Sequence, residues 1–126
     1  MNPEIWGPPL WYQMHMKTFN YNPKTSDKKD IIQYFENIKQ VLPCEKCKKH
    51  YENYLIARPV KFYLNSRDDL IHWLIDLHNE VNARTGKKIL SYKEARSLYE
   101  TPSHLNIVLL LFLLLLLLLL KIYFRK

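Results

Sequence analysis

Glycine is almost missing from this chain, with two residues among 126. Sheet-rich folds need many tight turns, and glycine is a common turn residue, so its scarcity favours helices over strands. Cysteine is equally rare, at two residues, which excludes the multi-bridge framework of small secreted domains. No apolar run follows Met1, because Asn2, Pro3 and Glu4 come next, so no cleaved signal peptide is expected.

The sequence also lacks an arginine-rich arm and a recognition-helix motif for nucleic acid. The formal net charge of +7 therefore predicts a solvated basic surface and no nucleic-acid partner. Aromatic and aliphatic residues are plentiful enough for one compact core, and a chain of 126 residues fits a single domain.

The C-terminus departs from this pattern, because residues 107–120 form an unbroken apolar run that is almost all leucine. Counted from 105 to 124, with Lys121 reaching toward the headgroups and Tyr123 at the interface, the segment attains the ~20 residues that span a bilayer. An oligomerising core helix or a short interfacial segment are the alternatives. The expected organisation is a domain at 1–101, a linker at 102–104, a transmembrane anchor at 105–124 and a basic tail at 125–126.

Helical periodicity dominates the rest of the chain. Apolar residues recur three and four positions apart, and proline or glycine separates these stretches. The expected helices cover residues 6–19, 27–41, 44–56, 67–84 and 92–99, with Ser26, Asn65 or Ser66, and Ser91 as N-caps and Gly86 as a stop. The predicted fold class is all-α.

The two cysteines stand two residues apart, as Cys44 and Cys47. One helical turn can carry both sulfurs, so a disulfide here can open and close without refolding the domain. A helix N-terminus and three nearby lysines favour thiolate over thiol. A zinc site would need four ligands; His50 is a third on this turn, and His72 or His78 would have to be the fourth, so no metal is predicted.

A second motif follows about thirty residues later, where the segment from His78 to Asn82 reads HNEVN. His78 and Asn82 lie one helical turn apart and so share a face, as do Trp11 and His15 on the first helix. Histidines on apolar helix faces also occur as plain core residues.

Together these motifs resemble the Erv/ALR family of FAD-linked sulfhydryl oxidases. The matching pieces are Trp11-x-x-x-His15, Cys44-x-x-Cys47, Trp73 with the HNEVN segment that follows it, and Gly86-Lys87. The match covers roughly residues 6–99, and the short form is similar to members carried by large DNA viruses. The resemblance implies a four-helix bundle with a short fifth helix that cradles FAD beside the cysteine pair.

The resemblance also implies roles for individual residues. A substrate thiolate would attack Cys44, while Cys47 would lie nearer the flavin and reduce it. Lys87 and Lys88 would lie near the phosphates, and Tyr99 would stack on the adenine. The implied FAD site comprises Gly7, Trp11, His15, Cys47, His50, His78, Asn79, Val81, Asn82, Lys87, Lys88 and Tyr99.

The implied activity is a thiol oxidase, which turns two thiols of a protein into a disulfide and O2 into H2O2. The implied partners are a thioredoxin-like or virion dithiol protein, a second copy of this chain in a homodimer, and a membrane. Many cellular members add a shuttle cysteine pair and a structural disulfide. This chain has neither, so its single cysteine pair must take electrons directly from the partner.

Two other functions fit parts of the pattern. A flavin-free thioredoxin-like oxidoreductase would need strands around its cysteine pair, and none are predicted. A tail-anchored adaptor without enzymatic activity, in which the disulfide of Cys44 and Cys47 is a structural clip, is the alternative. The expected location is a membrane, with one C-terminal span and the domain facing the host cytoplasm or belonging to a virion membrane.

Overall fold

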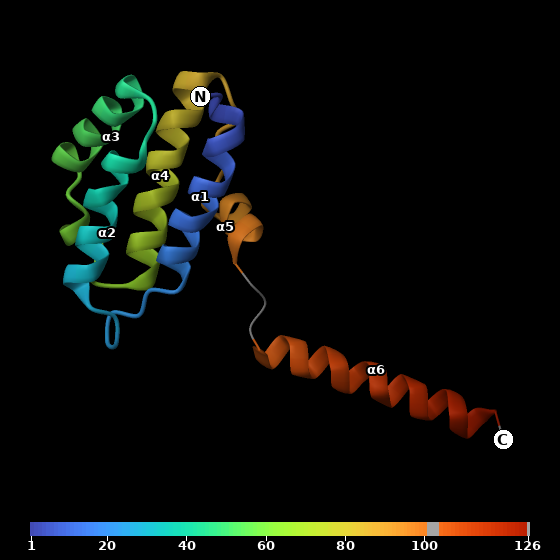
Figure 1. The fold of residues 1–126 in the computed structure, drawn as a ribbon. Coiled ribbons are helices and arrows are strands. Elements are labelled where there is room, and N and C mark those ends of the chain that lie inside the picture. The colour runs from blue at the N-terminus through green and yellow to red at the C-terminus, as the bar shows by residue number, and fades with distance from the viewer. Residues whose placement is uncertain (101–103, 126) are drawn as a thin grey trace.

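The computed structural model describes residues 1–100 and 104–125, and every regular element in these two ranges is helical. The elements are α1 (Pro3–Phe19), α2 (Lys28–Val41), α3 (Glu45–Ala57), the short 3₁₀ helix η1 (Val60–Tyr63), α4 (Arg67–Thr85), α5 (Tyr92–Tyr99) and α6 (His104–Phe124). Figure 1 shows α1 to α4 as a bundle, with the short α5 beside α1. The predicted all-α class is confirmed, and η1 is the element that periodicity did not predict.

Polar side chains at the N-caps start α1, α2, α4 and α5, because each accepts a backbone N–H that has no partner within its helix. These caps are Asn2, Asp27, Ser66 and Ser91. The prediction that Ser26 caps the second helix is wrong: Asp27 takes that place, and the Ser26 hydroxyl accepts the N–H of Asn22 inside the preceding loop. Gly86 ends α4 as predicted, with a φ of 72° that glycine adopts at low cost.

Large aromatic and aliphatic side chains from the four long helices fill one core. Trp73 of α4 is 1% exposed and meets the ring of Phe35 edge-on, with 4.9 Å between centroids. Two buried hydroxyls of α3 donate to backbone carbonyls across this core, Tyr51 to Phe35 and Tyr54 to Trp73. Each bond satisfies a buried polar group, so the tyrosines hold α3 in register against α2 and α4.

Two contacts establish that α1 and α4 run in opposite directions. Lys87, just beyond the end of α4, pairs with Glu4 at the start of α1, with 2.9 Å between Nζ and Oε1. Arg67 at the start of α4 donates a hydrogen bond to the carbonyl of Phe19 at the end of α1. The bundle therefore has two ends, one where α1 starts and one where it finishes.

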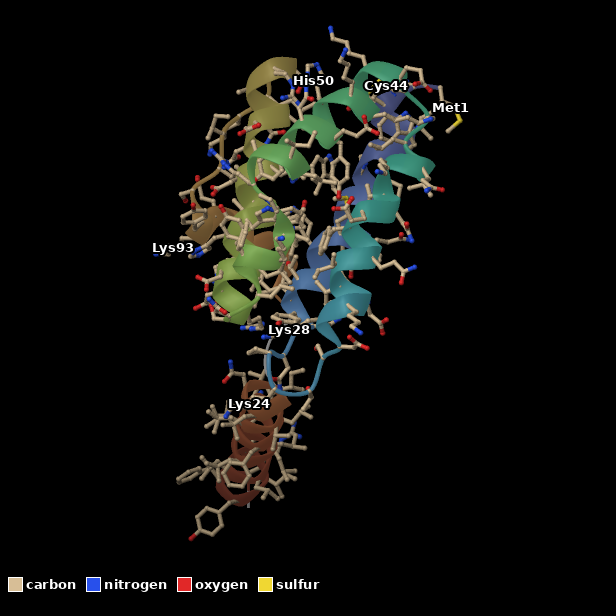
Figure 2. All side chains as sticks on the ribbon, turned by 90° about the vertical axis from the view of Figure 1, so that its left-hand side faces the viewer. Met1, Lys24, Lys28, Cys44, His50 and Lys93 are labelled. Carbon is tan, nitrogen blue, oxygen red and sulfur yellow. A yellow bond between two sulfur atoms is a disulfide. The ribbon has the colours of Figure 1, made fainter. Side chains whose placement is uncertain are left out.

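These two ends differ in what they carry. The end where α1 starts also carries Cys44 and is called the disulfide end; the opposite one, which carries the loop between α1 and α2, is called the loop end. Figure 2 places Cys44 and His50 at the disulfide end and Lys24 and Lys28 at the loop end. A ligand or partner bound at one end is therefore separated from the other end by the length of the bundle.

The last helix, α6, is apolar on all sides, and none of its spanning stretch is buried. That stretch, Leu105–Phe124, has 20 residues and a mean hydropathy of 3.1, so it is long and apolar enough to cross a membrane. Its bounds coincide with the segment expected from the sequence. Residues 101–103, which include most of the expected linker, and Lys126 of the expected tail lie outside the described residues.

Candidate functional site

The cysteine pair forms a disulfide at the first turn of α3. Cys44 is the N-cap rather than the first helical residue, and its Sγ accepts the backbone N–H of Cys47 at 3.2 Å. The two Cα atoms are 5.1 Å apart, within the usual range for a disulfide. Both residues are half-buried, so an incoming thiolate can reach the bond without the helix unfolding.

The surroundings of the disulfide are electropositive. The start of α3 contributes a partial positive charge. Lys46 and Lys49 are exposed and make no ion pair with any described residue, whereas Lys48 pairs with Glu45 at 3.0 Å. His50 is half-buried one turn further along α3, also at the disulfide end (Figure 2). The helix start and the unpaired Lys46 and Lys49 favour the thiolate form of a reduced pair.

Four rings from three helices pack together in what is called the ring cluster. Trp11 stacks on His78, with 3.8 Å between ring centroids and 5° between planes. His15 stacks on Tyr99 at 4.0 Å and 11°. A hydrogen bond of 3.0 Å between Nε2 of His15 and Nδ1 of His78 joins the two stacks. The fold thus brings together residues of α1, α4 and α5 that the resemblance to the family assigns to one site.

Three polar side chains on these helices have an atom without a hydrogen-bond partner among the described residues, and two of them are buried at that unpaired atom. Nδ1 of His15 and Nε1 of Trp6 are buried without a hydrogen bond to the described residues. Asn82 is 7% exposed as a residue, and its amide, which solvent still reaches, bonds to nothing in the described part of the chain. A Cβ placed on the buried Gly7 would meet no atom within 4 Å. Native proteins rarely leave such groups unpaired, so the pattern is typical of a site for a polar ligand.

Asn79 and Val81 behave differently from their motif neighbours. The amide Nδ2 of Asn79 donates to the carbonyl of Leu90 at 2.8 Å, and its Oδ1 accepts the N–H of Leu90 at 3.0 Å. Both polar ends of this side chain are therefore used to hold the segment between α4 and α5. Val81 is half-buried on α4.

The two lysines expected near phosphates are paired with carboxylates. Lys87 contacts Glu4 and Lys88 contacts Glu94, each at 2.9 Å. All four side chains are largely exposed. Exposed pairs of this kind contribute about 0–1 kcal/mol, so a phosphate can displace either carboxylate at little cost.

Trp6 is a candidate site residue that the sequence reasoning missed. Its ring packs partly against the main core, yet its buried indole N–H lacks an acceptor among the described residues. A tryptophan at the start of an amphipathic helix is typical of a core residue, so its type did not mark it. The available signal in the sequence was the adjoining Gly7, one of only two glycines. The structure shows that Gly7 is buried beside open space.

Both histidines of the ring cluster are neutral at physiological pH. Burial, and then the neighbouring His78, lower the pKa of His15 to about 3. Burial, and then Lys87, lower the pKa of His78 to about 4. In the bond between the two neutral rings, one ring nitrogen donates its proton and the other accepts it. Nδ1 of His15 is therefore either a donor or an acceptor, according to the tautomer, and in both cases it is unpaired among the described residues.

Acid is expected to destabilise the fold through this pair. The unfolded chain binds protons at both histidines below about pH 6.5, while the folded chain does not until pH 3 to 4, so stability falls as pH drops through that window. From pH 7 to pH 5 the loss should be up to about 2 kcal/mol for each histidine. Urea unfolding of the cofactor-free protein in detergent measures it. His78→Gln should show a shallower pH dependence than the native chain, and an equal slope in both would contradict the assignment.

Three comparisons with known proteins agree with this geometry. Residues 8–100 match the model of the Erv1 / Alr family. The chain is 42% identical over 98 residues to a probable FAD-linked sulfhydryl oxidase of Acanthamoeba polyphaga mimivirus, covering 75% of this chain and 68% of that one. It is 36% identical over 97 residues to an FAD-linked sulfhydryl oxidase of African swine fever virus, covering 75% of this chain and 80% of that one.

Among solved structures, the crystal structure of the yeast Erv1 core superposes with a TM-score of 0.71 at 22% identity, covering 79% of this chain and 85% of that one. This likeness establishes the arrangement of helices. The family match spans most of the bundle, including the disulfide and the ring cluster. The chain therefore belongs to the Erv1/Alr family.

Proposed function

We propose that this chain is an FAD-linked sulfhydryl oxidase, which turns two thiols of a protein into a disulfide and reduces O2 to H2O2. The observation that carries the proposal is the half-buried disulfide of Cys44 and Cys47 at the N-terminus of α3 in a chain of this family. The chain covers 68% of the mimivirus relative and 80% of the African swine fever virus relative. Both relatives are named for this activity, and this supports the proposal.

The protein's own part in the reaction is a dithiol–disulfide exchange. A substrate thiolate attacks Sγ of Cys44, the bond to Cys47 breaks, and Cys47 leaves as a thiolate. The second substrate thiolate then attacks the substrate sulfur of this mixed disulfide, and Cys44 leaves as a thiolate. The substrate has lost two electrons and two protons, and the cysteine pair holds the electrons. FAD, when bound, supplies the two-electron acceptor between this pair and O2.

The N-cap position of Cys44 favours the second step of this exchange, in which Cys44 is the leaving group. Thiols with lower pKa values leave faster in thiol–disulfide exchange. A Cys44 thiolate would retain the hydrogen bond from the N–H of Cys47 and the field of the helix start, both of which stabilise its charge. Release of the oxidised substrate, in which Cys44 is the leaving group, is therefore the step that this geometry assists.

The residues around the ring cluster fit FAD. Trp11, His78 and Tyr99 are half-buried rings that could stack on a flavin or an adenine, and the fully buried His15 supports them through its stack on Tyr99 and its bond to His78. The unpaired amide of Asn82 and the indole N–H of Trp6 offer polar groups for the carbonyls and ring nitrogens of a flavin, and Gly7 leaves room beside α1. Lys87 and Lys88 would hold the pyrophosphate by exchanging their carboxylate partners for it, and Val81 and His50 would complete the walls.

Membrane attachment, the partner and the assembly are further parts of the proposal. A single span by α6 would hold the domain at a membrane, with the domain facing the host cytoplasm or belonging to a virion membrane. The viral relatives support a virion dithiol protein as substrate, with a thioredoxin-like protein as the other candidate, and a role in virion assembly. Exposed Ile5 and Tyr12, seven residues apart on α1, support a dimer through the first helices.

The test is the stoichiometry of the reaction. The purified full-length chain in detergent should carry a flavin absorption band and consume O2 when given dithiothreitol. One O2 lost and one H2O2 gained should accompany each dithiol oxidised. A colourless protein that still contains the disulfide would instead support the adaptor with a structural clip.

The same measurement on a chain that ends at residue 104 separates the site from α6. Every proposed site residue precedes this point, so the shortened protein should be soluble, retain its flavin and oxidise dithiothreitol at the rate of the full chain. Sedimentation should still show a dimer if the first helices form the interface. Loss of flavin would mean that α6 is part of the domain, and an active monomer would place the dimer contact in α6.

A further inference from the structure

The chain leaves the bundle at a fixed place. Glu100 is the last described residue before α6, and its Oε1 pairs with Arg67 at 3.1 Å. Arg67 also donates to the backbone carbonyl of Phe19 at 2.9 Å. The exit point is therefore tied to both the end of α1 and the start of α4, which meet at the loop end of the bundle.

The connection from this exit point to α6 is short. Three residues, 101–103, separate Glu100 from the first residue of α6. Four Cα–Cα steps span at most about 14 Å even when fully extended. If α6 crosses a membrane, as the proposed function holds, the exit point stays within about this distance of the start of the span.

Three lysines project from the loop end. Lys24 lies in the loop between α1 and α2, and Lys28 and Lys29 begin α2. All three side chains are exposed and make no ion pair with the described residues. Four carboxylates share this end: Asp27 and Asp30 lie among the lysines, and Asp68 and Asp69 lie in the first turn of α4, where Asp68 pairs with Arg96 at 2.9 Å. Free ammonium groups close to a bilayer are attracted to anionic headgroups.

The disulfide lies at the far end of the bundle. Cys44 follows α2, whose first residue, Lys28, is at the loop end (Figure 2). The 17 residues of α1 give the bundle a length of about 25 Å between its two ends. That distance exceeds the Debye length of ~8–10 Å at physiological salt, so the lysines beside the disulfide gain little from the headgroups.

We propose that the domain stands on an anionic membrane on its loop end, with Lys24, Lys28 and Lys29 in the headgroup layer and the Cys44–Cys47 disulfide presented to the aqueous phase. This inference rests on α6 spanning the membrane and does not depend on thiol oxidation. It narrows the substrate to dithiols that approach from the aqueous phase, since thiols embedded in the same bilayer would lie below the domain.

Lysine acylation in lipid nanodiscs tests this orientation. The full-length chain is placed in discs of phosphatidylcholine, in discs that also contain phosphatidylserine, and in neutral detergent micelles. A small amine-reactive reagent is added, and mass spectrometry gives the rate at each lysine. In anionic discs Lys24, Lys28 and Lys29 should react about fivefold more slowly than in micelles, with a smaller decrease in neutral discs and a loss of the difference at high salt.

Two sets of lysines in the same chain serve as matched controls. Lys46 and Lys49 at the disulfide end and Lys93 on the side of the bundle (Figure 2) are all exposed and should react equally in every setting. Protection of Lys93 would mean that the domain lies on its side, and protection of Lys46 and Lys49 would mean that it is inverted. Equal reactivity of Lys24, Lys28 and Lys29 in neutral and anionic discs would overturn the headgroup contact.

A variant with a long glycine–serine insert between residues 103 and 104 isolates the effect of the tether. The insert removes the limit on distance, so protection in neutral discs should vanish, while part of the protection in anionic discs should remain. If the native chain does not co-elute with the discs, α6 is not a membrane anchor and the inference is overturned. The flavin band and O2 consumption, measured separately in detergent, would then still decide the proposed oxidase activity.

Discussion

Serine at position 47 is expected to lower the rate of dithiothreitol oxidation by about a thousandfold or more, the order seen when a covalent nucleophile is removed. The variant has no disulfide for a substrate thiolate to attack, and no sulfur at the position proposed to pass electrons to the flavin. Residue 47 is the third of α3 and half-buried, so the smaller hydroxyl should be tolerated. O2 consumption measures the loss, and an unchanged circular dichroism spectrum shows that the fold is retained.

Cys44→Ser is the matched variant, because serine is among the best N-caps and should keep α3 intact. It should be equally inactive with dithiols, but its remaining thiolate at Cys47 should add an absorption band at wavelengths longer than those of the flavin. Normal dithiol turnover by either variant would refute the redox role of the pair. A long-wavelength band in Cys47→Ser but not in Cys44→Ser would mean that the order of the cysteines is reversed.

Asn82→Ala is expected to weaken FAD binding by about 5- to 150-fold, which corresponds to the 1–3 kcal/mol cost of an unmet polar group. The amide of Asn82 is unpaired in the described structure and is still reached by solvent, so its removal should leave the cofactor-free protein about as stable as before. The purified variant should be paler, and its melting temperature should fall only when FAD is present. Flavin titration and thermal unfolding with and without FAD measure both effects.

Asn79→Ala supplies the contrast from the same motif. Its amide makes two hydrogen bonds to the backbone of Leu90, so its loss should destabilise the protein by about 1–3 kcal/mol whether or not FAD is bound. For a domain of this size each kcal/mol lowers the melting temperature by about 4–8 °C. If Asn82→Ala also melts lower without FAD, or keeps full flavin, the role proposed for Asn82 is wrong.

The helices themselves could be predicted from the sequence because their signals are local. Apolar spacing, Ser91, Gly86 and the leucine run each act within a few residues, and the helices lie close to where these signals placed them, although α1 begins at Pro3, three residues before its expected start. The error at Ser26 has the same local origin, since two adjacent residues were both suitable caps and the hydrogen bond to Asn22 decided between them. The CxxC spacing likewise permitted a disulfide within one turn, which the structure contains.

The hydrogen-bond and ion-pair partners of polar side chains could not be predicted from the sequence. Periodicity placed His78, Asn79 and Asn82 on one helix, but only the packing of the segment before α5 decided that Asn79 is engaged and Asn82 is not. The pairing of Lys87 with Glu4 joins residues that are far apart in the chain.

The sequence by itself determined the helices, the cysteine pair and the apolar segment, because each depends on neighbouring residues. The tertiary structure decided that the disulfide and the exit toward α6 lie at opposite ends of the bundle, because this depends on the antiparallel packing of α1 and α4. It also decided that the ring cluster joins α1, α4 and α5. Distances between such distant segments arise only when the core packs, so no local pattern encodes them.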